Sequence, residues 1–91
     1  MWRTMRSFEL VEQALMLRVG ANVRSLRHAA RLTVQAAASK ATIHWRHWQK
    51  IEAGKLNTTL WTLTRVALAL EVDVELLFRD SVLHPHGAML S

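Results

Sequence analysis

The sequence predicts an all-α domain built from five helices. Its 91 residues include only one proline and three glycines, so few positions would interrupt a helix. No segment alternates apolar with polar residues as a half-buried strand does, whereas apolar residues recur at the steps of three and four that a helix requires. We expect a single domain over residues 1–80 and a poorly ordered tail over 81–91, where Pro85 and Gly87 oppose a helix.

The first helix is predicted over about residues 7–30, with Ser7 as its N-cap. One apolar stripe continues along this segment at the helical period, and its members are Val11, Leu15, Val19, Val23, Leu26 and Ala30. A second stripe in the first half consists of Leu10, Ala14, Leu17 and Ala21. The helix has more apolar surface than one core contact would cover, so its first half either crosses between two layers or packs against another subunit.

The second and third helices are short and are joined by a three-residue turn. Thr33 is a good N-cap for an alanine-rich helix over 33–40, and the small side chains of this helix would let a neighbouring helix approach closely. Residues 41–43 break it, a third helix is predicted over 44–53, and Gly54 ends that one. Two short helices joined in this way, with helices before and after them, have the shape of a helix-turn-helix domain.

A fourth helix is predicted over 59–70, starting from Thr58 or Thr59. Its apolar residues form a stripe that we expect to be buried, and they are Leu60, Leu63, Val66, Ala67 and Leu70. Asp73 is the expected N-cap of a short fifth helix over 73–79.

Positive charge is concentrated in the middle of the chain. The formal net charge is +5, and residues 19–60 carry seven basic side chains against the single acid Glu52, whereas residues 61–91 carry two basic against four acidic ones. Such a distribution indicates either that one face meets a polyanion or that a solvated surface is unevenly charged.

The composition excludes several classes of protein and site. Because the chain has no cysteine, it can form no disulfide or thiolate zinc site, and it is typical of a reducing compartment. Glu9 and Glu12 stand where a signal peptide would be apolar, and no apolar run approaches the roughly 18–20 residues of a membrane span. Paired acids, a glycine-rich phosphate loop and a Ser/His/Asp arrangement are all missing, so we expect neither an enzyme nor a cofactor.

Three collinear groups of residues resemble the phage-repressor and Cro-like (XRE-type) helix-turn-helix family. The match runs without a gap from about Leu17 to Phe78. The family pattern IR.LR is matched by Val23, Arg24, Leu26 and Arg27, and the pattern IE.G by Ile51, Glu52 and Gly54. A third pattern is matched by Asn57, Leu60, Leu63, Val66, Ala67, Ala69, Leu70, Val72, Leu77 and Phe78. The resemblance implies a five-helix lambda-repressor-like domain, here with an N-terminally extended first helix.

The resemblance also implies one buried ion pair, and three positions depart from the family pattern. Arg27 and Glu52 are expected to pair beneath the DNA-binding surface. Val34 stands where the family often has a phosphate-binding Gln, Thr42 where the turn usually has Gly, and His44 where Ser or Thr usually caps the third helix. These departures affect the expected contacts of the second helix and the turn, and they leave the core pattern intact.

The third helix divides its side chains between the core and the outside. At about 100° per residue, Trp48 points inward, whereas Arg46, Gln49 and Lys50 point outward. Arg46 can bond guanine, Gln49 can pair with adenine, and Lys50 can reach guanine or a phosphate, although a merely solvated polar face is the alternative. Trp45 lies on the border, where it either seals the core or contacts a thymine methyl or sugar, and it joins the candidates for base reading.

Backbone amides at the starts of the second and fourth helices are expected to hold DNA phosphates. Polar side chains near those starts and on the third helix would assist them, and these are Thr33, Gln35, Lys40, His44, His47, Lys55, Asn57 and Thr58. We expect no metal site, because His44 and His47 have no carboxylate or cysteine beside them, and His84 and His86 lie in the tail.

These features predict a transcription regulator that binds double-stranded DNA with sequence specificity. One such domain reads only a short half-site, so we expect a homodimer that represses a palindromic operator. The expected dimer interface comprises Leu10, Ala14, Leu17, Leu76, Phe78, Val82 and Leu83.

A second interpretation is a protein-interaction module that keeps the fold and has lost specific DNA reading, which the atypical Val34, Thr42 and Trp45 motivate. Within the first interpretation, phage repressors, controller proteins of restriction–modification systems and antitoxins all have short chains without a sensor domain. A toxin or other protein partner has no support in the sequence. We expect a cytoplasmic protein of a prokaryotic or phage-infected cell, without membrane association.

Overall fold

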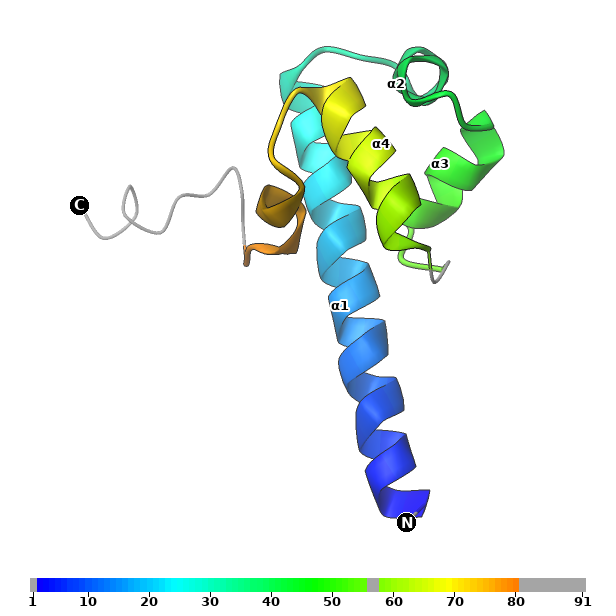
Figure 1. Ribbon diagram of the computed structural model, residues 1–91, viewed down its shortest axis with the longest axis vertical. Coiled ribbons are helices and arrows are strands. Elements are labelled where there is room, and N and C mark those ends of the chain that lie inside the picture. Colours follow the sequence, from blue (N-terminus) through cyan, green and yellow to red (C-terminus); the bar gives the residue numbers. More distant parts are fainter. Residues whose placement is uncertain (1, 56–57, 81–91) are drawn as a thin grey trace, which may run out of the picture.

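Four α-helices and one short 3-10 helix make up the part of the chain that the structure describes, residues 2–55 and 58–80 (Figure 1). In this computed structural model the elements are α1 (Trp2–Ala29), α2 (Val34–Ala41), α3 (Trp45–Glu52), α4 (Leu60–Leu70) and η1 (Val74–Phe78). The all-α prediction is confirmed, since the described residues contain no strand. The expected fifth α-helix is instead the 3-10 helix η1, a form that suits a segment of only five residues. The expectation for the tail 81–91 lies outside the described residues.

The core forms where the second half of α1 meets the shorter helices. α1 packs against α3 and η1, and α2 packs against α3 and α4. The buried apolar side chains come from all five elements and are Val19, Val23, Leu26, Ala37, Ala38, Ala41, Trp48, Ile51, Leu63, Val66, Ala67, Ala69, Leu70 and Leu77. None of the described helices combines the length and the hydropathy that a membrane span needs.

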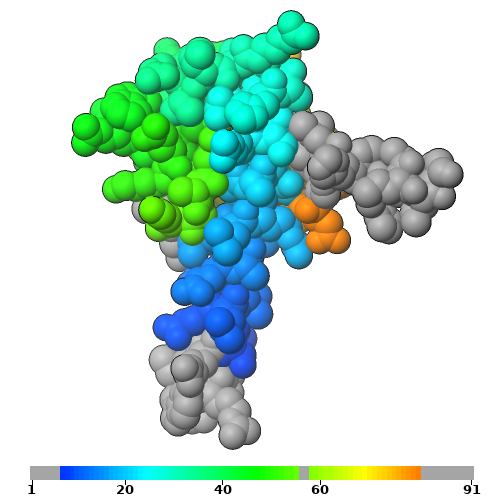
Figure 2. Space-filling view, turned by 180° about the vertical axis from the view of Figure 1, so that it is seen from behind, coloured from blue at the N-terminus to red at the C-terminus, as the bar shows by residue number. Residues whose placement is uncertain are grey.

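α1 begins at Trp2, well before the predicted start, so Ser7 lies inside the helix and does not cap it. The first residues of α1 contain neither Gly nor Pro, and nothing in them stops the helix from continuing toward the N-terminus. This N-terminal part of α1, residues 2–17, projects from the rest of the molecule in Figure 1, and its coloured part projects in the same way in Figure 2. We call it the α1 arm.

The buried stripe predicted for α4 is wrong at its first residue, and the apolar stripe of α1 is not covered along its whole length. On the α1 arm, Val11 is 66% exposed, and Leu15, which lies beside Phe78 on one side, is still 40% exposed. Leu60 is 66% exposed because it is the first residue of α4, and Ala30 is exposed because it follows the end of α1. Helical periodicity identified the right side of each helix but not the length over which that side is covered.

Three helices end at a non-glycine residue in the left-handed conformation. The φ angle is 58° at Arg31 after α1, 58° at Thr42 after α2 and 59° at Glu71 after α4. At each end, backbone amides of the turn donate hydrogen bonds back to carbonyls of the last helical turn. The carbonyls that a helix leaves without partners are thereby satisfied inside the turn.

Gly20 allows the backbones of α1 and α3 to come into contact. A Cβ atom at this position would lie 2.7 Å from the carbonyl oxygen of Glu52 and closer still to that of Ile51. Both obstructing atoms belong to the backbone of α3, so they cannot move without shifting the helix. The close contact places the C-terminal end of α3 directly on α1.

Replacing Gly20 with alanine should therefore lower the free energy of unfolding by about 1–3 kcal/mol, as overpacking does. Helix propensity alone would favour alanine by about 1 kcal/mol, so a loss of stability isolates the packing effect. Urea unfolding of Gly20→Ala measures it, with Ala21→Ser at the neighbouring exposed position as the control, for which we expect a change within about 0.5 kcal/mol. A more stable Gly20→Ala would contradict this contact between α1 and α3.

Candidate DNA-binding surface

The turn between α2 and α3 has the geometry of a helix-turn-helix motif, although its residues depart from the usual pattern. Thr33 caps α2, and its hydroxyl oxygen accepts a hydrogen bond from the amide of Ala36 at 3.0 Å. Thr42 takes the left-handed conformation that the family's glycine would adopt, and the Ile43 amide donates to the Ala38 carbonyl at 3.0 Å. The turn is thus formed without the glycine, and Thr42 bears the steric cost.

His44 caps α3 through its imidazole ring. Its Nδ1 accepts a hydrogen bond from the amide of Arg46 at 3.1 Å, which is the role that a Ser or Thr hydroxyl usually has. The ring also stacks on Trp45, with 5.7 Å between the ring centroids and 25° between the planes. One ring nitrogen of His44 is therefore committed to the cap, and only Nε2 is left to meet a phosphate.

Trp45 is half-buried and packs against the core, which favours the first of its two predicted roles. The guanidinium carbon of Arg46 lies 5.2 Å from the centroid of the Trp45 ring, a cation–π arrangement. The indole therefore supports the side chain of Arg46 at the surface and restricts its freedom.

Arg46, Gln49 and Lys50 are exposed together on one side of α3. Trp48 on the opposite side is fully buried, and Ile51 beside it is 3% exposed, so α3 cannot rotate to present a different side. We call Arg46, Gln49 and Lys50 the recognition face. It offers hydrogen-bond donors on all three side chains and an acceptor on Gln49, which is the chemistry that the edges of guanine and adenine require.

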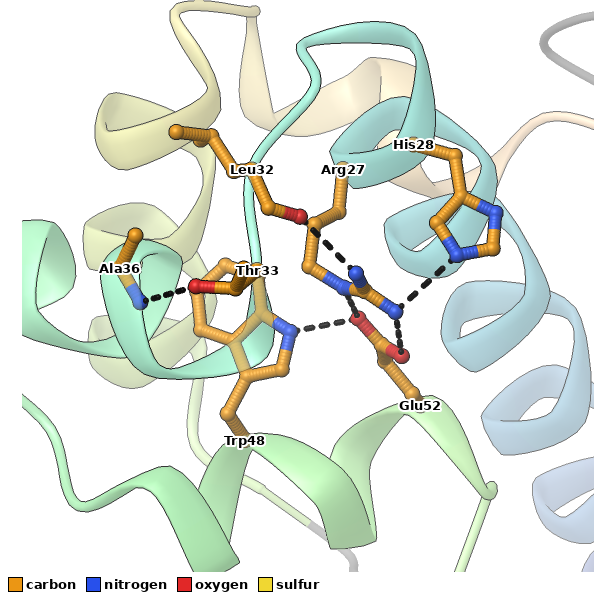
Figure 3. Close-up of polar contacts among 7 residues, drawn as sticks. All are labelled: Arg27, His28, Leu32, Thr33, Ala36, Trp48 and Glu52. Carbon is orange, nitrogen blue, oxygen red and sulfur yellow. Dashed lines mark hydrogen bonds and ion pairs between the residues drawn. The ribbon is translucent and has the colours of Figure 1, made fainter.

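A buried network beneath the recognition face ties α3 to α1 (Figure 3). The structure contains the ion pair that the sequence led us to expect: Arg27 donates from Nε to Oε2 of Glu52 at 2.6 Å and from Nη2 to Oε1 at 3.1 Å. Trp48 donates from Nε1 to the same Oε2 at 2.6 Å, and Arg27 Nη1 donates to the carbonyl of Leu32 at 2.9 Å. Arg27 Nη2 also donates to Nε2 of His28 at 3.3 Å, since a guanidinium has no acceptor.

The charge of Arg27 is stable across the whole practical pH range. The hydrogen bond that Arg27 donates to Glu52 raises the pKa of Arg27 above its ordinary value, burial opposes this, and the charge of Glu52 adds to the increase. A group whose pKa is raised on folding contributes stability below its unfolded pKa and loses it only as the pH rises through the folded value. For an arginine that window is strongly alkaline, so the guanidinium stays charged wherever the protein folds.

The candidates for phosphate contacts divide into exposed and enclosed side chains. Gln35 and Lys55 are exposed, whereas Nε2 of His47 and Oγ1 of Thr58 are buried without a hydrogen-bond partner among the described residues. Lys40 is exposed, but its Nζ lies 3.8 Å from a carboxylate oxygen of Glu71.

The amides at the start of α4 are also available to a phosphate. Thr59, one of the two candidates, is the residue that caps α4, and its hydroxyl accepts a hydrogen bond from the Thr62 amide at 3.1 Å. The cap therefore lies at the end of the segment, Asn57 to Thr59, whose backbone amides were expected to hold a phosphate. Asn57 lies outside the described residues.

A family model described as a helix-turn-helix domain matches residues 18–78 of the chain. The chain belongs to this helix-turn-helix family. The family fragments recognised in the sequence fall within the matched range, and the whole α1 arm lies before it. Family membership makes the chain a DNA-binding transcription regulator and not an enzyme, as the sequence predicted.

The fold of the helix-turn-helix regulator is similar to that of a solved protein structure. It resembles the crystal structure of the restriction-modification controller protein C.AhdI from Aeromonas hydrophila, with 26% sequence identity and a TM-score of 0.70. The match covers 71% of this chain and 98% of the controller protein. No curated protein matches the chain.

The residues expected to form the dimer interface of this helix-turn-helix regulator do not make one surface. Leu10 and Leu17 are 65% and 58% exposed, and Leu17 lies against Gly54 at the end of α3. Phe78 packs instead beside Leu15, which is about 200° around α1 from Leu17. Ala14 is exposed on the same side of α1 as Leu10 and Leu17, whereas Leu76 packs partly against the core. Val82 and Leu83 lie outside the described residues.

Among residues 2–55 and 58–80 of the regulator, no group of three or more His, Asp or Glu side chains could hold a metal ion. His44 and His47 share α3, but the first caps the helix and the second is partly enclosed.

Proposed function

We propose that the chain is a sequence-specific regulator that represses transcription by binding a palindromic double-stranded DNA operator as a homodimer. The recognition face is the observation that carries the proposal. Arg46, Gln49 and Lys50 are exposed together, with Arg46 supported by the Trp45 ring. An α-helix fits the major groove, where each base pair presents a distinct pattern of donors and acceptors.

A rigid base supports this function, because base-specific hydrogen bonds require fixed positions. The Arg27–Glu52 pair joins α1 to the C-terminal end of α3. One helical turn earlier, Trp48 is fully buried in the core, and its Nε1 orients the Glu52 carboxylate within α3. The ion pair and the buried indole together restrain the orientation of α3. The recognition face would therefore present its side chains with little loss of conformational entropy on binding.

Phosphate contacts would orient the domain on the duplex without adding sequence information. The helix starts capped by Thr33 and Thr59 present free amides, and Gln35 and Lys55 stand exposed. Lys40, His44, His47, Asn57 and Thr58 complete the proposed set, with Lys40 having to leave Glu71 in order to contribute. Binding should consequently weaken steeply as the salt concentration rises.

The homodimer follows from how much DNA one domain can read. A single recognition face contacts a short half-site, and two faces related by a two-fold axis read an inverted repeat with much greater affinity. Of the three types that the sequence left open, the similarity to C.AhdI favours the restriction-modification controller over the phage repressor or antitoxin.

Selection of bound duplexes from random DNA by the full chain tests the proposal. The expected product is an enriched inverted repeat whose two half-sites lie about one helical turn apart. An enriched half-site without a repeat would contradict the homodimer. Recovery of no enriched sequence even at low salt would overturn specific reading and favour the interaction module, for which the exposed apolar residues of the α1 arm would be the surface.

Two alanine variants should separate base reading from phosphate binding. Arg46→Ala should cost about 1–3 kcal/mol of discrimination at one position of each half-site, whereas Lys55→Ala should weaken all duplexes alike and reduce the salt slope by about one. Fluorescence anisotropy with the selected operator and single-base variants measures both effects. Arg18→Ala, whose side chain pairs with Asp80 away from α3, is the control and should change neither. Uniform weakening by Arg46→Ala would remove Arg46 from base reading.

A further inference from the structure

The outer side of α4 carries two large apolar side chains that the domain leaves uncovered. Trp61 is 69% exposed and Leu68 is 72% exposed. They lie seven residues apart, so they face the same way two turns along the helix. The guanidinium carbon of Arg65, on the turn between them, lies 4.5 Å from the centroid of the Trp61 ring. This cation–π contact holds the exposed indole in place and sets a positive charge beside it.

An open hollow of about 620 Å³ lies at the other end of the same side of α4. Its lining begins at Leu68 and continues into η1, and it consists of Leu68, Glu71, Val72, Asp73, Glu75, Leu76 and Arg79. Its lining therefore carries three carboxylates against one guanidinium, together with the apolar side chains of Leu68, Val72 and Leu76. We call this surface the acidic hollow. Its apolar side chains offer contact to an aromatic ring, and its net negative charge would neutralise a cation accompanying the ring.

We propose that this side of α4 is a self-complementary interface at which two copies of the chain join, with Trp61 of each copy seated in the acidic hollow of the other. Two-fold symmetry places every residue opposite its counterpart across the axis, so an interface of this kind needs a projection and a recess at equal distances from the axis. With the axis near Leu68, which itself lines the acidic hollow, Trp61 lies about 10 Å along α4 to one side and the rest of the hollow lies to the other. The two α4 helices then run antiparallel across the axis.

Trp61 with Arg65 and the acidic hollow are complementary in their chemistry, in addition to their positions. When Trp61 binds in the hollow, its indole and the apolar side chains of the hollow are removed from water. Arg65 packs on the Trp61 ring, so its guanidinium would lie near the carboxylates of the hollow. Tryptophan and arginine are the residue types that most often dominate the binding energy of protein interfaces. The interface also explains an otherwise unfavourable feature of the surface, namely two large apolar groups exposed beside an excess of negative charge.

This interface deepens the proposed homodimer and rests on it. It replaces most of the interface expected from the sequence, because Leu10, Ala14 and Leu17 lie on α1 and take no part in it. Leu76 is the one member of that expected set that lines the acidic hollow.

Sedimentation equilibrium of the full chain tests the role of Trp61. Trp61→Ala should raise the dimer dissociation constant by at least about tenfold, as the loss of a central tryptophan does. Leu60→Ala is the matched control, because Leu60 is the preceding residue, is similarly exposed at 66% and points away from this side of α4. Its dissociation constant should equal that of the parent chain. Because Trp61 and Leu60 are largely exposed, both variants should keep the circular dichroism of the parent chain.

A charge exchange tests the two-fold arrangement itself. Arg65→Glu and Glu75→Lys should each weaken the homodimer, because each places like charges at both symmetry-related contacts. An equimolar mixture of the two variants should form a heterodimer at least about tenfold tighter than either homodimer, because opposite charges then meet at both contacts. A defect in folding could not be rescued in this way.

The outcomes separate this interface from the function on which it rests. A parent chain that stays monomeric at high concentration, or a Trp61→Ala variant that dimerises like the parent chain, would overturn the interface and leave this side of α4 to a different protein partner. Mixed charge variants that fail to associate would overturn the two-fold arrangement. If the α4 interface holds while duplex selection recovers no operator, the proposed function fails and the interface stands.

Discussion

Replacing Glu52 with alanine is expected to lower the free energy of unfolding by about 3–5 kcal/mol. The side chains of Arg27 and Glu52 are only 10% and 9% exposed. Removing the carboxylate would leave a buried guanidinium with one backbone acceptor, and would leave Nε1 of Trp48 without a partner. Because small domains have only about 5–15 kcal/mol of stability in total, the variant should lie close to its unfolding transition at ambient temperature.

Urea unfolding followed by far-UV circular dichroism measures the loss at Glu52. The matched control is Arg18→Ala, which breaks a second ion pair of the same chemical type: Arg18 Nη2 lies 3.2 Å from Asp80, with side chains 45% and 90% exposed. An exposed pair contributes only about 0–1 kcal/mol, so the two variants should differ by several kcal/mol. Equal effects would show that burial of the Arg27–Glu52 pair has no special importance.

Replacing Trp48 with alanine should cost about 3–5 kcal/mol, through the loss of a fully buried indole and the cavity that it leaves. Trp48→Phe separates the two contributions of this residue. Phenylalanine fills most of the volume but cannot donate to Glu52, so its cost should be limited to about 1–3 kcal/mol for a hydrogen bond to a charged group.

Thermal and urea unfolding of the two Trp48 variants should give the order parent, phenylalanine, alanine. If both variants lost the same amount, the hydrogen bond to Glu52 would account for the whole contribution of Trp48, and core packing for none. Under conditions in which they are still folded, both variants should also bind the operator more weakly than the parent chain. The reason is that Trp48 lies on the inner side of α3, whose outer side carries the recognition face.

Much of the fold was predictable from local patterns. Apolar residues at steps of three and four along α1 identified Val19, Val23 and Leu26 as core. The angular position of each residue around α3 placed Trp48 inside and Arg46 outside. These assignments hold because each depends only on the direction of a side chain around its own helix. The pairing of Arg27 with Glu52 came instead from family resemblance, since nothing local to α1 points to a residue on α3.

The expectations that were wrong or incomplete concern burial and pairing, which depend on the other elements that surround a residue. Leu60 lies on the predicted side of α4, but the end of that helix is not covered. Lys40 is basic and close to the motif, yet it lies beside Glu71, an acid that is distant in sequence. The enclosed Nε2 of His47 and the hydroxyl of Thr58 are similar cases. Burial and ion pairing at such positions depend on which elements meet, and one sequence does not determine this by periodicity alone.

The left-handed residues that close α1, α2 and α4 bear on how the protein could evolve or be engineered. Arg31, Thr42 and Glu71 each hold a backbone conformation that costs a side-chain-bearing residue about 1–2 kcal/mol. None of them belongs to the recognition face. Glu71 also lines the acidic hollow, so only Arg31 and Thr42 are free of a proposed contact there. Glycine at these two positions offers a reserve of thermal stability that could offset a destabilising change in the residues that specify its operator.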